Sequence, residues 1–495
     1  MLVSSTGDLT ITNDGATILK DIDVEHPIAK MMVEVAKSVD NEAGDGTKSV
    51  VVVAGFLIEN AEELFNKDVH ATIIVEGFRA ASKKAIDFLK ISIEVDPKDK
   101  SFLNKIAMTS MASKMVTTNS KVLSAIVVDA AMNVADELEG NKFKIDIDNI
   151  KVEKKTGGSL HDTRLVQGIV IDKEVAHSGM PKKIQGAKIV LLNFALEIEK
   201  TKSDSKLNIS SPDQMQNFLN EEEKMLESMV NRISASGANV VLCQKGIDDI
   251  VQHYLAKEGI IAVKRIKESD MSKLSKATGA RIVTNTGELS KDDIGLAELV
   301  EERKIETDKW VFIEGCKNPK SVTILIRGGS QRLVDEAERS IHDALMAVKC
   351  VVEYPFVVVG GGASEAIVSR KLKEGSASLA SRQQLAVEKY ADAVESIPLV
   401  LAENAGMSAI DAQADLRTKS KEAGKARYGI DAFKGKIADL STRDIYEPLT
   451  VKNQVINSAT EAACMILRID DIISAAAPTG DAPPPGGPYG GMPEY

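Results

Sequence analysis

The sequence is poor in aromatic residues: phenylalanine, tryptophan and tyrosine make up 4% of the chain, with a single tryptophan. Its cores must therefore be built from aliphatic side chains and methionine. A chain of 495 residues is long enough for more than one domain. The hydrophobic content of 43% and the charged content of 27% are those of an ordinary globular protein.

The sequence also lacks an excess of positive charge, paired cysteines and long apolar runs. The 62 basic and 73 acidic residues are interspersed and sum to a net charge of −11, which argues against a nucleic-acid partner. No two of the four cysteines form a CxxC pair, so we expect free thiols in a reducing compartment; they are Cys243, Cys316, Cys350 and Cys464. No apolar run reaches the length of a membrane span, and the N-terminus does not resemble a signal peptide. We therefore predict a cytoplasmic protein with no membrane partner.

The first part of the chain predicts a hairpin followed by helices. The stretch "GDLTITNDGATILK" alternates apolar and polar residues around Asn13-Asp14-Gly15, which is typical of a tight β-hairpin. Apolar residues then recur at helical spacing between residues 26 and 44. A second, largely buried helix is expected from Thr47 to Lys67.

The middle of the chain has a different pattern. Four short apolar runs have the length of strands: "AKIVLLNFAL", "ANVVLCQ", "GIIAVKRI" and "ARIVTN". Helical stretches lie between the later runs, as in residues 247–257 and 271–278. Strands that alternate with helices predict a βαβ layout with a parallel component.

One helix in this region is unusually long. Ser211 is a suitable N-cap and Pro212 a suitable first residue, and apolar residues repeat at helical spacing up to Ile233. Its middle, from Asn220 to Lys224, is polar all round. We therefore expect a helix that projects beyond its domain. Helical ends around an α/β middle further predict one domain made from both termini with another inserted between them.

The loop Gly44-Asp45-Gly46 joins two predicted helices and runs directly into Thr47. Glycines at a helix N-terminus allow backbone N–H groups to approach an anion, and the helix dipole favours that anion. The hydroxyls of Thr47 and Ser49 and the charge of Lys48 add to such a site. An aspartate among phosphate-binding groups makes sense mainly as a ligand for a divalent cation. The residues alone leave two interpretations open, a nucleotide site and an ordinary helix–helix turn.

Three further candidates have equally ordinary explanations. Gly360–Gly362 connect a predicted strand to a helix, either as a tight turn or as a second phosphate loop. Asp14 fits a turn-forming residue, and Asp343 fits a solvated acid on an amphipathic helix. Local chemistry does not decide among these possibilities.

The order of the motifs along the chain carries a resemblance. "TITNDGATIL", "AGDGTKSVVVVAG", "ERSIHDAL", "VVGGGASE" and "EAACMILRIDD" follow one another in the order found in the group II chaperonins, the family of the archaeal thermosome and the eukaryotic cytosolic chaperonin. Further matches include "MPKKI", "SKATGA" and "LVEERKI", and the resemblance extends over residues 1–473. The "GGMPEY" tail is similar to archaeal members.

This resemblance implies a multi-domain α plus α/β chaperonin fold. The expected parts are an equatorial ATP-binding domain (1–98 and 359–475), an intermediate domain (99–168 and 322–358), an apical substrate-binding domain (169–321) with a helical protrusion at about 203–232, and a disordered Pro/Gly-rich tail (476–495).

The resemblance also implies a site for ATP and Mg²⁺, with K⁺ as a further cation. Asp45 would bind the metal, while Asp14 and Asp343 would orient and activate the attacking water. The expected nucleotide-binding residues are Asn13, Gly15, Gly44, Gly46, Thr47, Lys48, Ser49, Gly360, Gly361, Asp431, Ala432 and Glu447. Asp343 belongs to the intermediate segment, so its approach to the phosphate would couple hydrolysis to closure of a built-in lid.

Two departures from the family pattern separate the functional hypotheses. The family has an upstream "LGPKGMDK"-type phosphate loop, so we expect this chain to be N-terminally truncated, and Lys48 stands where the family usually has a second threonine. The leading hypothesis is an ATP-driven subunit that, with copies of itself or paralogues, encloses non-native proteins in a double ring. The alternative is an ATPase-impaired structural subunit of such a ring. A small-molecule kinase with a mobile lid is a weaker third hypothesis, because no other motif indicates a substrate pocket.

Overall fold

The protein is described by a computed structural model that covers residues 1–3, 7, 9–112, 114, 116–140, 142–198, 211–316, 320–377, 379, 381–423 and 427–473. The predicted tail and residues 203–210 of the predicted protrusion lie outside these ranges. All four cysteines are buried and free, as predicted. In the part of the chain that is described, no helix combines the length and the hydropathy needed to cross a bilayer.

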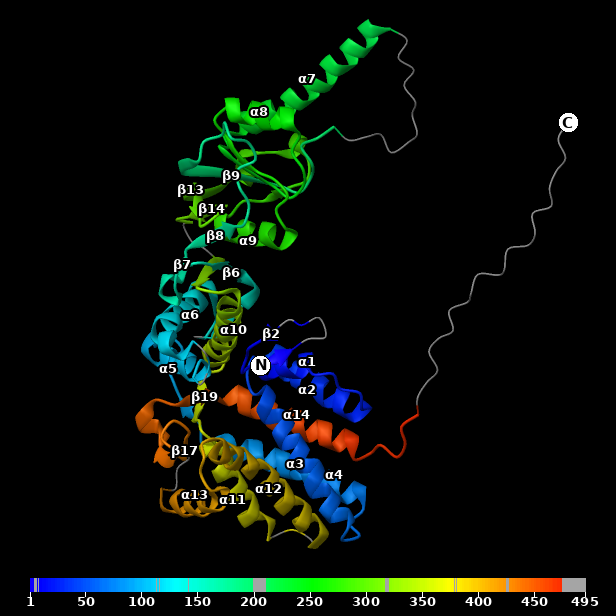
Figure 1. The fold of residues 1–495 in the computed structure, drawn as a ribbon, viewed down its shortest axis with the longest axis vertical. Coiled ribbons are helices and arrows are strands. Elements are labelled where there is room, and N and C mark those ends of the chain that lie inside the picture. Colours follow the sequence, from blue (N-terminus) through cyan, green and yellow to red (C-terminus); the bar gives the residue numbers. More distant parts are fainter. Residues whose placement is uncertain are drawn as a thin grey trace, which may run out of the picture.

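The molecule is elongated and consists of three bodies, which we call lower, middle and upper as they stand in Figure 1. Each body has its own large cluster of buried apolar side chains. The lower and middle bodies each combine two separate stretches of the chain, whereas the upper body is one continuous stretch. The chain therefore runs from the lower body to the upper body and returns.

The lower body is mainly helical. Its helices are α1 (Gly15–Asp21), α2 (Pro27–Ala43), α3 (Thr47–Phe65), α4 (Ala71–Leu89), α11 (Ala363–Ser376), α12 (Ser381–Asn404), α13 (Ala409–Ala423) and α14 (Leu449–Ile466). Its short strands are β1 (Leu2–Val3), β2 (Leu9–Thr10), β3 (Ile93–Glu94), β16 (Phe356–Val359), β17 (Tyr428–Asp431), β18 (Lys436–Asp439) and β19 (Tyr446–Pro448). The two helices predicted on either side of the 44–46 loop are confirmed as α2 and α3. Helix α3 packs against α12 and α14, which explains its run of valines.

The predicted hairpin at Asn13-Asp14-Gly15 is wrong. The only pairing in this region of the described chain joins β1 to β2, antiparallel, before Asn13. Asp14 is instead the N-cap of α1, with extended backbone angles and a side chain that accepts hydrogen bonds from Ala16 and Thr17. A short acidic side chain satisfies free backbone N–H groups in turns and at helix N-termini alike, so the local sequence did not separate the two.

The middle body packs helices against a small sheet. It contains α5 (Lys100–Ser110), α6 (Ser120–Val134), α10 (Gln331–Glu353), β4 (Ala135–Leu138), β5 (Lys142–Ile145), β6 (Ile150–Thr156), β7 (Arg164–Val166) and β15 (Val322–Gly328). Strand β15 lies between β6, to which it is parallel, and β7, to which it is antiparallel. Helix α10 packs against α5 and α6, and it carries the buried residue Asp343.

The upper body is built on a mixed seven-stranded sheet. Its strands are β8 (Gly168–Ile171), β9 (Lys183–Leu192), β10 (Val240–Cys243), β11 (Ile261–Val263), β12 (Ile282–Val283), β13 (Gly295–Ile305) and β14 (Asp308–Glu314). Strands β9 to β12 pair in parallel, which confirms the predicted βαβ component, while β13, β14 and β8 complete the sheet antiparallel. The helices are α7 (Pro212–Ser236), α8 (Asp249–Lys257) and α9 (Glu268–Thr278).

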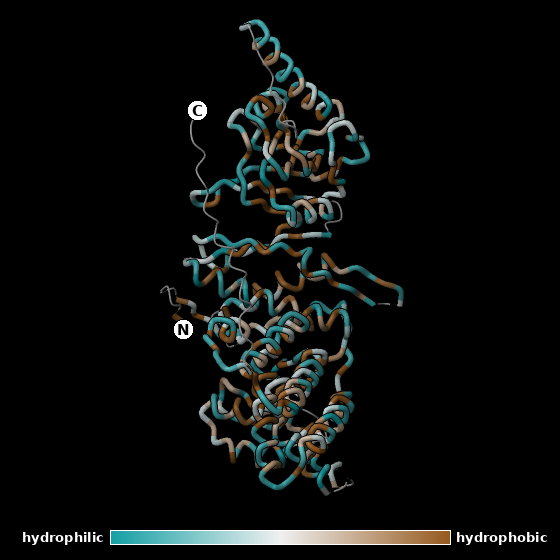
Figure 2. Tube along the Cα trace, turned by 90° about the vertical axis from the view of Figure 1, so that its right-hand side faces the viewer, coloured by the Kyte–Doolittle hydropathy of each residue, from teal (hydrophilic) through white to brown (hydrophobic). Residues whose placement is uncertain are grey.

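Helix α7 projects from the upper body, as predicted (Figure 1). The Ser211 side chain caps it by accepting a hydrogen bond from the Gln214 N–H at 3.3 Å, and proline occupies the first turn. Its only buried side chains lie in the C-terminal half, at Leu226, Val230 and Ile233. Figure 2 shows hydrophilic and hydrophobic stretches alternating along the free part. The apolar anchors therefore hold one end of the helix, and the other end stands in solvent.

Candidate functional site

The 44–46 loop packs against two helices from different parts of the chain, α10 and α14. Gly44 and Gly46 both have left-handed backbone angles, with φ of 65° and 87°. A Cβ on Gly44 would lie 2.1 Å from the Cβ of Met346 in α10, and one on Gly46 would lie 2.7 Å from Cγ2 of Val455 in α14. Backbone angles and space thus both require glycine at these two positions. Asp45 between them is exposed, and its Oδ1 accepts a hydrogen bond from the Gly46 N–H at 2.6 Å.

The start of α1 lies against the start of α3. A Cβ on Gly15 would be 2.5 Å from the Thr47 hydroxyl and 2.7 Å from Cγ of Lys48. The Lys48 ammonium donates to the carbonyl of Asn13 at 2.8 Å, and Ser49 is half-buried in the same first turn of α3. The structure therefore brings together the predicted residues of the "TITNDGATIL" and "AGDGTKS" motifs.

Asp14 is held in one orientation by its own helix. Its carboxylate accepts hydrogen bonds from the Ala16 N–H (3.1 Å), the Thr17 N–H (2.9 Å) and the Thr17 hydroxyl (2.5 Å). Burial raises the pKa of Asp14, but these hydrogen bonds, together with the charge of Lys114, outweigh it and leave the pKa below its ordinary value. Asp14 is therefore a fixed, ionised carboxylate at neutral pH.

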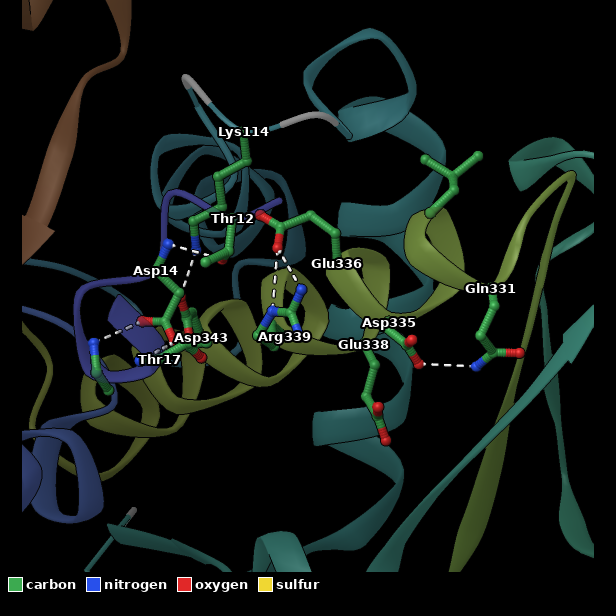
Figure 3. A network of polar contacts seen from close by, with 12 residues as sticks. Thr12, Asp14, Thr17, Lys114, Gln331, Asp335, Glu336, Glu338, Arg339 and Asp343 are labelled. Atoms are coloured by element: carbon green, nitrogen blue, oxygen red, sulfur yellow. Dashed lines mark hydrogen bonds and ion pairs between the residues drawn. The ribbon is translucent and has the colours of Figure 1, made fainter. Parts of the chain in front are cut away.

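Asp343 of α10 faces this carboxylate from the middle body. Burial is the main cause that raises the pKa of Asp343 to about 7. The ion pair with Lys114 lowers this pKa, and the charges of the nearby Asp45 and Asp14 raise it further. Figure 3 shows Asp14, Lys114 and Asp343 pointing toward one another. A carboxyl group with this pKa exchanges a proton near neutral pH, which is a property of general acids and bases.

Sequence reasoning missed two members of this cluster. Lys114 is a single lysine that belongs to no motif, and its partner is 229 residues away in the chain. Asp40 lies in the last turn of α2, where burial and the charges of Asp14 and Asp45 raise its pKa. Neither residue has a local signal, because only the fold brings them to the site.

A cavity of about 740 Å³ opens beside this cluster. Asp14 and Asp40 line it from the lower body, Asp343 from the middle body and Lys273 of α9 from the upper body. All three bodies therefore contribute to its wall.

The carboxylates suit a hard divalent cation. Asp14 and Asp45 raise the pKa of both Asp40 and Asp343, so the cluster carries mutual repulsion that a cation would relieve. Among the described residues, no three His, Cys, Asp or Glu side chains are close enough to form a protein-only metal cage. Mg²⁺ characteristically uses one or two carboxylates together with water and substrate phosphates, so this donor set fits it.

The second group of predicted residues surrounds the triple-glycine loop. The Ile430 N–H of β17 donates to the Gly361 carbonyl at 2.9 Å, and Gly361 has a φ of 66°. A Cβ on Gly360 would lie 2.5 Å from Oε1 of Glu447 in β19. Gly360, Gly361 and Glu447 thus form one cluster, next to the end of β17.

Asp431 ends β17 and is buried, with an ion pair to Arg443 at 2.7 Å. It lines a second cavity, of about 570 Å³, together with Met108 of α5 and Ile445. Ala432 follows in an exposed turn. The cavity has polar and apolar walls, which suits a ligand with a flat heterocycle.

Comparison with known proteins gives consistent results. The sequence profile of the TCP-1/cpn60 chaperonin family matches residues 1–477. The chain is 53% identical over 476 residues to the thermosome subunit alpha of Archaeoglobus fulgidus, covering 96% of this chain and 87% of that protein. It is 52% identical over 495 residues to the thermosome subunit beta of the same organism, covering 100% of this chain and 90% of that protein.

A solved structure agrees with the overall fold. An open-state monomer of a group II chaperonin from Methanococcoides burtonii matches with a TM-score of 0.65 at 42% identity, over 86% of this chain and 100% of that chain.

Proposed function

The chain belongs to the TCP-1/cpn60 chaperonin family, and from this premise we propose that it binds and hydrolyses ATP at the carboxylate cluster of Asp14, Asp45 and Asp343. As a group II chaperonin it is an ATP-dependent chaperone subunit of a double ring that folds non-native proteins. The relatives include subunits named alpha and beta, which supports assembly with copies of itself or with paralogues. The lower, middle and upper bodies would be the equatorial, intermediate and apical domains, with α7 as part of the lid.

The chemistry that these residues supply is mostly positioning and electrostatics, as in other phosphoryl transfers. Asp14, fixed by its hydrogen bonds to Ala16 and Thr17, orients the attacking water. Asp343, with a pKa of about 7, accepts its proton. Lys114 forms an ion pair that keeps the Asp343 side chain in place, and its positive charge would stabilise negative charge on a bound phosphate.

Two sets of residues would hold the nucleotide. Asp45 would hold Mg²⁺, which when bound neutralises charge on the phosphate oxygens. The backbone of the 44–46 loop and the hydroxyls of Thr47 and Ser49 would face the phosphates. Gly361, Asp431 and Glu447 would lie toward the ribose and the base, beside the 570 Å³ cavity that Asp431 lines.

The observation that carries the proposal is the meeting of Asp14, Lys114 and Asp343, from three distant parts of the sequence (Figure 3). Asp14 and Asp343 line the same cavity, and Lys114 forms an ion pair with Asp343. Structural ion pairs also bring charges together, but here two carboxyl groups have pKa values shifted in opposite directions. Such a divergence is typical of an acid–base site.

The test is ATP hydrolysis in the presence of Mg²⁺ by the wild type, Asp343→Asn and Asp335→Asn. Asp335 is a matched control, because it lies on the same helix and is likewise paired with a lysine, Lys154, at 2.7 Å. We expect Asp343→Asn to lower kcat by about 100-fold or more with little change in nucleotide affinity, and Asp335→Asn to retain activity. Equal losses in kcat and affinity for Asp343→Asn would contradict its role as proton acceptor.

The alternative function, a structural subunit with impaired turnover, rests on Lys48. Lys48 stands in the sequence where the family pattern has a threonine, and its ammonium donates to the Asn13 carbonyl at 2.8 Å. A wild-type chain that forms rings and binds ATP without hydrolysing it would favour this alternative.

A further inference from the structure

Three ionisable side chains meet behind the triple-glycine loop, outside the phosphate side of the site. The Lys452 ammonium forms an ion pair with Oε1 of Glu365 at 2.7 Å and a second ion pair with Glu447. The side chains of Lys452 and Glu365 are only 9% and 6% exposed. Oε2 of Glu365 also accepts a hydrogen bond from the Ser364 hydroxyl at 2.8 Å. The Glu447 side chain is partly buried, with 26% exposed, so one ammonium compensates one buried and one partly buried carboxylate.

The three residues come from the three elements that surround the loop. Glu365 is in the first turn of α11, directly after Gly362, and Lys452 is in the first turn of α14. Glu447 lies in β19 opposite Val358 of β16, the strand that leads into the loop. One Glu447 oxygen is held by Lys452, and the other lies against Gly360, where a Cβ would come within 2.5 Å of it.

The same turns of α14 also contact the 44–46 loop. A Cβ on Gly46 would lie 2.7 Å from Cγ2 of Val455 and 3.2 Å from Cγ1 of Val451. Val451 and Lys452 are adjacent, so one turn of α14 packs against one glycine loop and makes an ionic bond to the surroundings of the other. Helix α14 therefore connects the 44–46 loop to the triple-glycine loop and fixes the distance between them.

Breaking this cluster has a defined physical consequence. Without the ammonium, the buried carboxylate of Glu365 and the partly buried one of Glu447 would remain together, and their repulsion would drive them apart or lead to protonation. The Glu447 carboxylate would then leave its position against Gly360. A shift of this kind changes the shape of the nucleotide site without touching the residues of the carboxylate cluster.

We propose that Lys452 is a positioning residue of the nucleotide site: it holds the Glu447 carboxylate against Gly360 and fixes the spacing of the two glycine loops. The inference rests on the proposed function, since it assigns Lys452 to the base and ribose side of the same site.

The experiment compares Lys452→Met with Lys373→Met. Lys373 is a matched control because it lies on α11 and also pairs with two carboxylates, Asp392 and Glu395, each at 2.7 Å, away from both loops. The measurements are the Kd of ADP with Mg²⁺ by calorimetry, the KM and kcat for ATP, and the midpoint of thermal unfolding.

We expect Lys452→Met to weaken ADP binding and raise KM by about tenfold, with kcat changed by less than about threefold. Lys373→Met should lower the unfolding midpoint but leave the Kd within about twofold of the wild type. A Lys452→Met protein that loses stability like the control yet binds ADP as the wild type does would overturn the proposal.

If Lys452→Met does not fold, Lys452→Arg replaces it, because the charge is kept while its geometry changes. We then expect a near-normal unfolding midpoint with ADP binding weakened by about threefold, and an unchanged Kd would overturn the proposal. The wild type is measured alongside. If it binds no nucleotide, the proposed function fails, whereas normal wild-type binding with an unaffected variant refutes only the role of Lys452.

Discussion

Asp14 and Asp343 lie beside the same lysine, yet their pKa values move in opposite directions. Asp14 receives three hydrogen bonds from its own helix, which offset its burial. Asp343 has Lys114 as its lysine partner but is more deeply buried and faces the charges of Asp14 and Asp45. The difference assigns distinct roles to two residues of the same type, one permanently ionised and one able to exchange a proton.

The pKa of Asp343 predicts opposite effects of pH on activity and stability. The folded chain holds this proton more tightly than the unfolded chain, in which the pKa is near 3.8. The contribution of Asp343 to stability is therefore fully present below pH 3.8 and is lost as the pH rises through about 7. Deprotonation over the same upper range creates the proton acceptor, so we expect kcat to rise from pH 6 to pH 8 while the unfolding midpoint falls.

Asp343→Asn should remove both effects. Relative to the wild type, its free energy of unfolding should increase with pH between 5 and 7, by at most about 1.4 kcal/mol per pH unit for one proton. Asp40 has a raised pKa as well and remains in the variant, so some dependence of the same sign persists. Unfolding and hydrolysis measured across this range, for both proteins, check the prediction. A variant with the full wild-type dependence would remove Asp343 as its source.

The effect of Lys48 on ATP binding can be tested by replacing it with threonine, which has the hydroxyl of the family pattern. Lys48→Thr loses the bond to the Asn13 carbonyl, but the side chain is exposed, so we expect stability to change by less than about 1 kcal/mol. If the ammonium attracts the phosphates, KM for ATP should rise about three- to tenfold. Lys67→Thr, just beyond the other end of α3, is the control and should leave KM unchanged. A lower KM in Lys48→Thr would instead identify the lysine as an obstruction.

At the scale of the element, the turn between α2 and α3 requires glycine at position 44, directly after the end of α2. Gly44→Ala would place a methyl group in left-handed backbone and against Cβ of Met346, an atom that cannot move without its helix. We expect a loss of about 2–4 kcal/mol in unfolding free energy and a strong loss of ATP hydrolysis, because α10 carries Asp343.

The control lies on the neighbouring helix. Gly55 is within α3, and no atom lies within 4 Å of a Cβ placed there, so Gly55→Ala should be neutral or stabilising by up to about 1 kcal/mol. Chemical unfolding of both variants gives the comparison. Similar losses for the two would mean that the loop geometry has no special role.

The sequence predicted those elements whose signal is local and regular. Helices α2, α3 and α7 and the parallel strands around β9 followed from spacing, capping and strand length. Asp14 was misassigned to a hairpin, since its side chain suits both kinds of backbone. Lys114 and Lys452 could not be found at all, because Asp343, the partner of Lys114, and Glu365, one partner of Lys452, lie far away in the chain. The family resemblance supplied the rest of the candidate site, and its individual residues remain predictions.

At the scale of the whole molecule, the middle and upper bodies are joined by a buried ionic contact. Lys151 of β6, 7% exposed, donates to the Val170 carbonyl of β8 at 2.8 Å. Its ammonium also forms ion pairs with Glu153 of β6 at 2.9 Å and with Asp270 of α9 at 3.0 Å. The same helix carries Lys273 into the wall of the nucleotide-side cavity. Helix α9 is thus attached to the middle body at the point where it approaches the site.

Lys151→Met should loosen this joint, because it leaves two carboxylates without their buried partner. Breaking a buried ion pair on one side costs about 3–5 kcal/mol, and we expect that loss to appear first as faster amide hydrogen exchange in α9 (Glu268–Thr278). Lys90→Met removes an exposed ion pair with Asp87 and should change nothing measurable. If α9 keeps its wild-type protection in Lys151→Met, the bonds of Lys276 to Asn149 (2.6 Å) and Asp146 (3.4 Å) and the apolar contacts of Met271 and Leu274 suffice to hold it. If protection falls in α9 while α7 and α8 remain protected, the loss is local, and the ion pairs of Lys151 stabilise α9 against opening. Lys151 then fixes α9, and with it Lys273 at the cavity wall, to strand β6 of the middle body.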